Sequence, residues 1–207
     1  MTSLGAYVLS RQNLMCKKVL TVAIVFTMYF GGGLIPSFLL VRALGMYNTR
    51  WALIIPGAIA TWNLIVMKTS FQQIPASLEE SAKIDGANDF IVLFKIVMPV
   101  AKATVAVMIL FYAVGHWNSW FNAMIYLRKR ELWPLQLLLR EILIANSVGS
   151  GNVITAEQVL QDSGAVFLLD ELIKYATIII ATVPILFAYP FAQRYFMKGV
   201  MMGSLKE

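Results

Sequence analysis

Charged residues are scarce in this chain of 207 residues, where Asp, Glu, Lys and Arg together make up 14%. Soluble domains usually carry about 25% of these residues. Hydrophobic residues account for 59% of the chain, and the excess has to face lipid. The composition therefore predicts an all-α integral membrane protein. In that setting the net charge of +6 indicates basic loops beside a membrane rather than a nucleic-acid partner.

Cysteine and histidine are each present once, as Cys16 and His116. A single cysteine excludes an intrachain disulfide and a cysteine-rich metal site. A single histidine excludes a site built from several histidines. We expect no metal ion and no directly bound cofactor.

Catalytic motifs are also missing. The chain has no Gly-x-x-x-x-Gly-Lys-[Ser/Thr], no Gly-x-Ser-x-Gly and no His-Glu-x-x-His, so neither ATP hydrolysis by the phosphate-loop route nor any other enzyme activity is predicted. Its carboxylates lie in loops or at the ends of apolar segments, whereas an ion-driven carrier is expected to bury such groups in the membrane. These observations favour a passive transport pathway whose energy is supplied by a partner protein. A secondary carrier or channel and a truncated, non-transporting membrane protein are the alternatives.

Four apolar segments are predicted to span the membrane, at about 19–41, 51–71, 100–120 and 172–193. A helix of about 20 residues crosses the hydrocarbon core. The first segment contains the run 31–33 of three glycines and Pro36, and the second and last segments also contain prolines. Such breaks need packing partners or a lined cavity in lipid, and close helix packing is the favoured explanation for the glycines.

Between these segments, residues 1–18 are predicted to be a cytoplasmic N-terminal segment and 121–171 an external loop. The external loop contains one amphipathic helix, and its apolar stripe is formed by Trp133, Leu135, Leu138, Leu139, Ile142 and Leu143. Four spans place both chain ends on one side of the membrane. Lys and Arg are somewhat more numerous on the side that holds residues 73–99, which favours a cytoplasmic position for that loop and for both termini.

The polar loop 73–99 is predicted to hold two short helices. Ser77 is a candidate N-cap with Glu80 at the capping-box spacing, so the first helix should cover 78–85. Gly86 can adopt a positive φ and end it.

The second helix of the loop should cover 90–97. Asn88 or Asp89 can cap its start, and Pro99 should break the chain before the next apolar segment.

These residues carry a resemblance. The run Glu80-Ser81-Ala82, with Gly86 four residues later and Ile96-Val97-Met98-Pro99 at the end, resembles the "EAA" loop of bacterial ABC importer permeases. Ser81 and Met98 replace the usual Ala and Leu, and the extended form Asp85-Gly86-Ala87 is present. Several fixed identities at fixed spacing make this a specific signal.

The resemblance covers nearly the whole chain, and it is to the carbohydrate importer permeases of the maltose-permease type, above all the LplC type that serves complex oligosaccharides. It rests on residues 115–121, 134–143, 175–191 and 193–199. It implies that 19–207 form a type I ABC importer transmembrane domain. Tyr7-Val8-Leu9-Ser10-Arg11 is similar to the segment after the second span of such permeases, so two N-terminal spans of the family are expected to be absent here.

By this resemblance the chain is expected to be a permease subunit of an ATP-driven carbohydrate importer, coupled to an ATPase through 77–99. The implied coupling residues are Glu79, Glu80, Ser81, Ala82, Lys83, Asp85, Gly86, Ala87, Ile96 and Pro99. The implied partners are a second permease subunit in a heterodimer, a dimer of ATPase subunits that binds ATP and Mg²⁺, and an extracytoplasmic sugar-binding protein. The implied location is the bacterial plasma membrane.

Substrate contacts are harder to assign from sequence. Aromatic rings and amides suit hydroxyl-rich ligands, which makes His116, Trp117, Asn118 and Trp120 candidates. The same cluster is also typical of an interfacial aromatic belt. Asn63 could line the pathway or hydrogen-bond a neighbouring helix.

Overall fold

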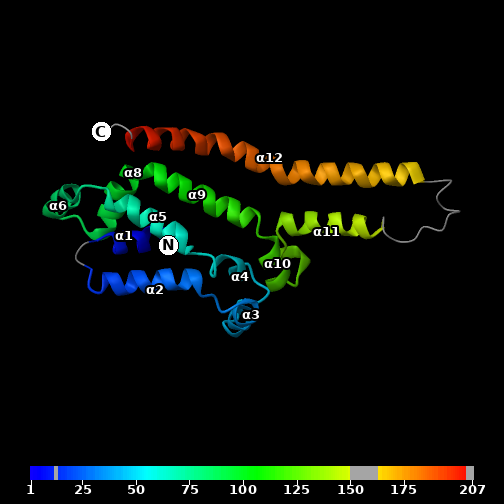
Figure 1. Ribbon diagram of the computed structural model, residues 1–207, viewed down its shortest axis with the longest axis horizontal. Helices are drawn as coiled ribbons and strands as arrows, with labels where there is room; N and C mark the ends of the chain where they lie inside the picture. Colours follow the sequence, from blue (N-terminus) through cyan, green and yellow to red (C-terminus); the bar gives the residue numbers. More distant parts are fainter. Residues whose placement is uncertain (12–13, 150–162, 204–207) are drawn as a thin grey trace.

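Helices are the only regular secondary structure in the residues that the computed structural model describes, which are 1–11, 14–149 and 163–203. The all-α prediction is confirmed. Most helices run roughly along the long axis of the molecule, with the polar loop at one end (Figure 1). The predicted external loop falls partly on 150–162, which lie outside the described residues.

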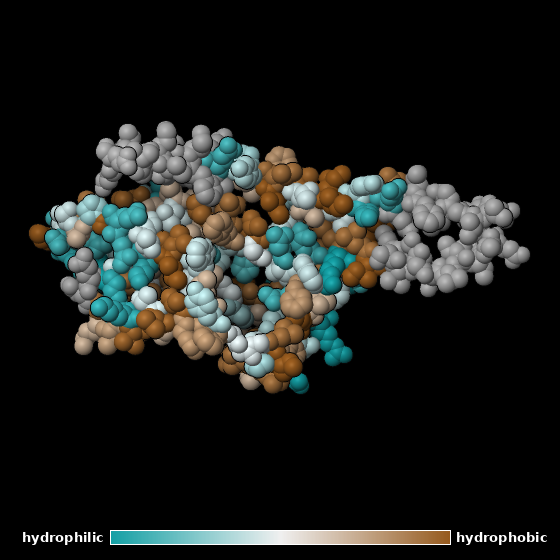
Figure 2. All heavy atoms as spheres, viewed as in Figure 1, coloured by the Kyte–Doolittle hydropathy of each residue, from teal (hydrophilic) through white to brown (hydrophobic). Residues whose placement is uncertain are grey.

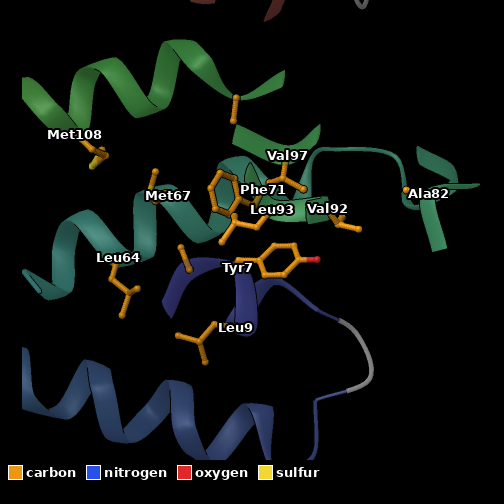
Figure 3. Close-up of a cluster of buried hydrophobic side chains, with 12 residues drawn as sticks. Tyr7, Leu9, Leu64, Met67, Phe71, Ala82, Val92, Leu93, Val97 and Met108 are labelled. Atoms are coloured by element: carbon orange, nitrogen blue, oxygen red, sulfur yellow. The ribbon is translucent and has the colours of Figure 1, made fainter. Parts of the chain in front are cut away.

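The main apolar core joins α1 (Thr2–Ser10), α5 (Thr61–Gln72), α9 (Lys102–Trp117) and the helical second half of the polar loop 73–99. Its buried side chains include Ala6, Tyr7, Leu9, Leu64, Met67, Phe71, Val92, Leu93, Val97 and Met108. Figure 3 shows these side chains converging from the different helices. The short N-terminal helix is therefore an integral part of the packing.

Tyr112, on α9, links three segments by hydrogen bonds. Its hydroxyl lies 2.6 Å from the hydroxyl of Thr2 and accepts a 2.9 Å bond from the backbone N–H of Ala60. Ala60 is the N-cap of α5, where backbone N–H groups have no helical partner. The tyrosine thus stabilises the start of α5.

The first predicted span, 19–41, is not one straight helix. It is divided into α2 (Lys17–Tyr29) and α3 (Leu34–Ala43), which meet at 114°. Gly33 at the junction has φ +85°, a value that favours glycine. The run of glycines therefore produces a sharp bend, whereas hydropathy alone had indicated a continuous segment.

The second predicted span, 51–71, is also interrupted. It consists of α4 (Trp51–Ile54), an irregular stretch around Pro56 and Gly57, and then α5. Proline removes a backbone donor and clashes with the preceding turn. The twelve residues of α5 are too few to cross a bilayer alone.

The third predicted span begins and ends differently, because α9 stops at Trp117 and 120–126 form the separate helix α10 (Trp120–Tyr126). The last predicted span lies inside one helix, α12 (Ser163–Gly203), which continues through Pro184 and Pro190. Within it, Glu171–Pro190 is long and apolar enough to cross a membrane. Two bent pairs, α2 with α3 and Asp89–Val100 with α9, pass the same test if each counts as one span.

Away from α6, the molecule holds α10, the short 3₁₀ helix η2 (Arg130–Leu132) and α11 (Leu135–Gly149) (Figure 1). The amphipathic helix predicted there is present, but Leu137 and Leu139 are its buried residues, and Leu135 is 41% exposed. The predicted stripe was therefore only partly correct.

Asn48 holds this end together. It adopts a positive φ of +59°, and its side-chain oxygen accepts hydrogen bonds of 3.0 Å from the backbone N–H groups of Arg128 and Lys129. Its own N–H donates to the carbonyl of Tyr126 at 2.9 Å. The loop after α3 is thereby fixed to the segment after α10.

Candidate functional site

The first helix of the polar loop, α6 (Ala76–Ile84), lies at the extreme end of the molecule (Figure 1). It begins directly after Pro75, which has an extended ψ of 131° and is itself the N-cap. No side chain caps this end. The prediction that Ser77 caps the helix in a capping box is therefore wrong, because proline's restricted backbone starts the helix two residues earlier.

Gly86 ends α6 as predicted, with φ +82°. The N–H of Gly86 donates to the carbonyl of Lys83 at 3.0 Å, and the N–H of Ala87 donates to the carbonyl of Ala82 at 2.9 Å. This pair of bonds is the Schellman motif, which satisfies helix carbonyls that would otherwise lack donors. The turn after α6 is thus a defined structure rather than a loose link.

The second helix of the loop starts with a side-chain cap. The Asn88 side-chain oxygen accepts a 2.8 Å bond from the N–H of Ile91, which confirms one of the two predicted caps. The helix is α7 (Asp89–Ile91), and it runs directly into the π-helix η1 (Val92–Val97) and then α8 (Met98–Val100).

The break predicted at Pro99 is displaced. The chain turns at Ala101, and the helical segment that includes Pro99 meets α9 at 91°. The wide π turns of η1 lie directly before Pro99, which has no N–H to continue an α-helical ladder. The loop therefore ends in a bent connection to the apolar core.

Apolar side chains of the loop divide between the core and the surface. Ala82 is 8% exposed, whereas Ile84 is 87% exposed. Of the other candidate coupling residues, those at the surface are Glu80, Ser81, Lys83, Asp85, Gly86 and Pro99, and those partly covered are Glu79, Ala87 and Ile96. Most candidates thus lie on or just after α6, where Ala82 is the one buried residue, and Ile96 and Pro99 lie in the helical segment that joins the core.

Two adjacent glutamates of α6 have different surroundings. Glu79 forms an ion pair with the guanidinium of Arg11, and its side chain is only 16% exposed. Glu80 is exposed and has no ion pair within the described part of the chain. One carboxylate is therefore held inside the protein and the next remains available to a partner. The motif did not distinguish the two.

A groove of about 820 Å³ opens between α1, the end of α5 and the polar loop. Its lining includes Arg11, Lys83, Glu79 and Asp89, which form ion pairs with one another. Hydrophilic residues gather over this end of the molecule in Figure 2. Glu80 also lines the groove, and its carboxylate is the one lining charge without an ion pair among the described residues.

The candidate pathway residues are not gathered in one place. Asn63 is buried on α5, at 8% exposure. His116 and Asn118 are exposed at the end of α9. No group of three or more His, Cys, Asp or Glu side chains that could hold a metal ion occurs among the described residues.

The two tryptophans among these candidates have contacts within the protein. The Trp117 indole N–H donates to the carbonyl of Ala181 on α12 at 3.1 Å. The guanidinium of Arg140 lies 3.8 Å from the ring centre of Trp120. These contacts show how both rings help to pack α9, α10, α11 and α12, and they leave the choice between packing and substrate contact open.

Apolar helices with many exposed large side chains, together with a structured polar loop at one end, are typical of an integral membrane protein. The chain belongs to the family of binding-protein-dependent transport system inner membrane components, which matches residues 11–129. It is accordingly a transport permease and not an enzyme in itself.

Individual relatives agree with this assignment. The chain is 47% identical over 206 residues to the polygalacturonan/rhamnogalacturonan transport system permease protein YtcP of Bacillus subtilis, a match that covers 100% of this chain and 70% of YtcP. It is 42% identical over 201 residues to protein LplC of the same organism, covering 97% of this chain and 66% of LplC.

A solved structure is similar as well. The crystal structure of a bacterial ABC transporter involved in the import of the acidic polysaccharide alginate aligns with a TM-score of 0.78 and 35% sequence identity. The alignment covers 94% of this chain and 69% of that chain. The chain thus spans about two thirds of the length of these relatives, and it is a permease component of the ABC importer type. The secondary carrier receives no support from these similarities.

Proposed function

We propose that this chain lines the translocation pathway of an ATP-driven oligosaccharide importer, and that residues 73–99 are the loop through which an ATPase subunit moves it. The observation that carries the proposal is the exposed apolar surface of the loop. Ile84 is 87% exposed, Phe90 65% and Leu78 43%. These side chains lie beside the exposed carboxylates of Glu80 and Asp85.

The size of this surface suits a docking contact. Full burial of one large apolar side chain stabilises a complex by about 1.5–3 kcal/mol. Three such residues supply enough apolar contact to seat a short helix in a groove, and the flanking charges orient it. Helix-in-groove binding of this kind is a recurrent mode of recognition.

The construction of the loop supports a mechanical role. Gly86 fixes the end of α6 by two backbone hydrogen bonds, and the following segment buries Val92, Leu93 and Val97 in the core beside α1 and α5. Figure 3 shows Tyr7 and Phe71 next to these side chains. A displacement of α6 is therefore delivered to packed helices and not absorbed in a flexible loop.

We assign the partners on the same basis. The importer comprises a second permease subunit in a heterodimer, a dimer of ATPase subunits that carries ATP and Mg²⁺, and an external sugar-binding protein. The segment 1–18, the loop 73–99 and the chain's C-terminal end face the cytoplasm, and 121–171 face outward. In support, the C-terminal end of α12 returns toward the end where α6 lies (Figure 1).

Oligosaccharides are the proposed substrate class. The names of two relatives refer to polygalacturonan with rhamnogalacturonan and to alginate, and galacturonan and alginate are both acidic polysaccharides. Galacturonate oligosaccharides are thus the first probe, with neutral maltooligosaccharides as the comparison.

The test is ATP hydrolysis by the importer assembled in proteoliposomes with its binding protein and the galacturonate probe. Gly86→Pro and Glu80→Arg should each abolish the stimulation of hydrolysis by substrate, because one breaks the turn and the other reverses an exposed charge. Lys18→Glu, which reverses an exposed charge on the same proposed side of the membrane but outside the loop, should have no effect. Stimulation that survives both loop changes would exclude the coupling assignment.

A further inference from the structure

Four charged side chains, Arg11, Glu79, Lys83 and Asp89, join the end of α1 to both helices of the coupling loop. We call them the Arg11 cluster. Arg11 forms ion pairs with Glu79 on α6 and, at 3.1 Å, with Asp89 on α7. Lys83 lies 3.4 Å from the same carboxylate oxygen of Asp89. Two positive and two negative groups make the cluster neutral.

Arg11 is held on a rigid support. It is the C-cap of α1, and its backbone carbonyl accepts a 2.8 Å bond from the Lys17 side chain. Its guanidinium lies 4.3 Å from the ring centre of Tyr7, a core residue with 5% exposure. A cation over an aromatic face is attracted to it. The position of Arg11 therefore follows that of α1 and the core.

Of the two ion pairs that Arg11 forms, the one with Glu79 is better shielded from water than the one with Asp89. The side chains of Arg11 and Glu79 are 23% and 16% exposed, whereas Asp89 is 66% exposed. Water screens exposed pairs strongly, so they contribute little. The partly buried pair should carry most of the attachment between α1 and α6.

Helix α6 has little else to hold it. Ala82 is its only buried residue, and alanine offers a single methyl group for packing. Without the pair to Glu79, a force on α6 could tilt the helix about its ends before the core moved. A planar guanidinium that reaches carboxylates on two helices resists such tilting better than an ammonium group.

We propose that Arg11 is a positioning residue for energy coupling, because it ties α6 and α7 to α1 so that a displacement of the loop moves α1 and the core with it. The inference rests on the proposed function of the loop. It assigns a task to the N-terminal residues Tyr7–Arg11, which lie outside the loop motif.

The experiment measures how α6 moves relative to α1 in the assembled importer. Spin labels are placed at Ser77, an exposed residue of α6 outside the proposed docking surface, and at Val8, which is 49% exposed, after Cys16→Asn removes the exposed native cysteine. Asparagine tolerates the left-handed backbone of this position. The distance between labels is measured without nucleotide and with a non-hydrolysable ATP analogue plus Mg²⁺. A third label at Leu186, on α12, reports whether α6 moves at all.

With labels alone, the nucleotide analogue should change the distance from Ser77 to Leu186 and leave that from Ser77 to Val8 unchanged. Arg11→Gln and Glu79→Gln should each allow the Ser77–Val8 distance to shift. The double variant should shift it no further than Arg11→Gln alone, because Arg11→Gln already removes the pair with Glu79. Arg130→Gln, which breaks the exposed Arg130–Glu141 pair at the other end, is the matched control and should behave as the unmodified chain.

The outcomes separate the inference from the function on which it rests. If the analogue does not change the Ser77–Leu186 distance in the chain with labels alone, the coupling function is wrong and the inference falls with it. If that distance changes but Arg11→Gln leaves the Ser77–Val8 distance constant, the loop is coupled by other contacts and Arg11 is not a positioning residue. Arg11→Lys, which keeps the charge, provides a folded variant that should show a smaller shift than Arg11→Gln.

Discussion

The turn at Gly86 offers a sharp test of how the coupling loop is built. In Gly86→Ala, the added Cβ would meet no atom within 4 Å, so the change introduces no clash with neighbouring residues. The free-energy cost of the substitution therefore comes from the backbone of residue 86, whose φ is +82°. An L-residue pays about 1–2 kcal/mol for the left-handed conformation, which corresponds to roughly a 5- to 30-fold change in an equilibrium constant.

Hydrogen exchange measures this cost where it arises. The backbone N–H of Ala87 donates to Ala82 only while the turn is closed, so its protection should fall by roughly 5- to 30-fold in Gly86→Ala if local opening governs exchange. Gly115→Ala is the matched control, because its Cβ also meets nothing within 4 Å and its φ is not in the left-handed region. Alanine within helix α9 should be neutral or stabilising. Equal protection of Ala87 in both variants would refute the account of the turn.

Three further changes remove side-chain hydrogen bonds, and each is measured by thermal unfolding of the purified chain in detergent. Tyr112→Phe should destabilise by about 1–3 kcal/mol, because the N–H of Ala60 loses its acceptor and the hydroxyl of Thr2 loses its partner; an unchanged midpoint would show that other groups replace it. Asn48→Ala should cost at least as much, since two backbone N–H groups share its oxygen and alanine is disfavoured at the φ of +59°. Trp117→Phe should cost about 1 kcal/mol by removing the bond to Ala181, and a larger loss would indicate that the ring, not the N–H, dominates.

Local backbone rules predicted much of the coupling loop. Gly86 and Asn88 were placed correctly because a positive φ and a side-chain cap depend on nearest neighbours in the chain. The N-terminus of α6 was misplaced, because Ser77 and Glu80 satisfy the capping-box pattern while Pro75 determines where the helix begins. Where two local signals compete, the pattern does not say which one prevails.

The apolar segments were predicted as regions but not as straight helices. Hydropathy measures the cost of contact with water and is insensitive to backbone direction. It therefore could not predict the 114° bend at 30–33 or the break in the helix after Ile54. The proline-containing helix α12, by contrast, is continuous. Glycine with a positive φ at Gly33 redirects the chain, whereas Pro184 and Pro190 do not stop the helix.

Contacts between residues that are far apart in the chain could not be predicted from the sequence. Arg11 and Glu79 are separated by about a third of the chain, and no periodicity relates them, yet they form an ion pair in the structure. Asn48, likewise, accepts hydrogen bonds from the backbone N–H groups of Arg128 and Lys129, which are 80 and 81 residues away. Both examples depend on which helices pack together, and that packing is a property of the whole fold.

The central claim, that the exposed face of α6 docks on an ATPase subunit, is tested most directly by photocrosslinking from Ile84. A benzophenone attached to Ile84→Cys in the Cys16→Asn background should form a covalent adduct with the copurified ATPase subunit of the importer. The same probe at Ile109→Cys, 65% exposed on the apolar helix α9, should form none. An adduct from Ile109 as readily as from Ile84, or no adduct from Ile84 in an importer that hydrolyses ATP, would contradict the account.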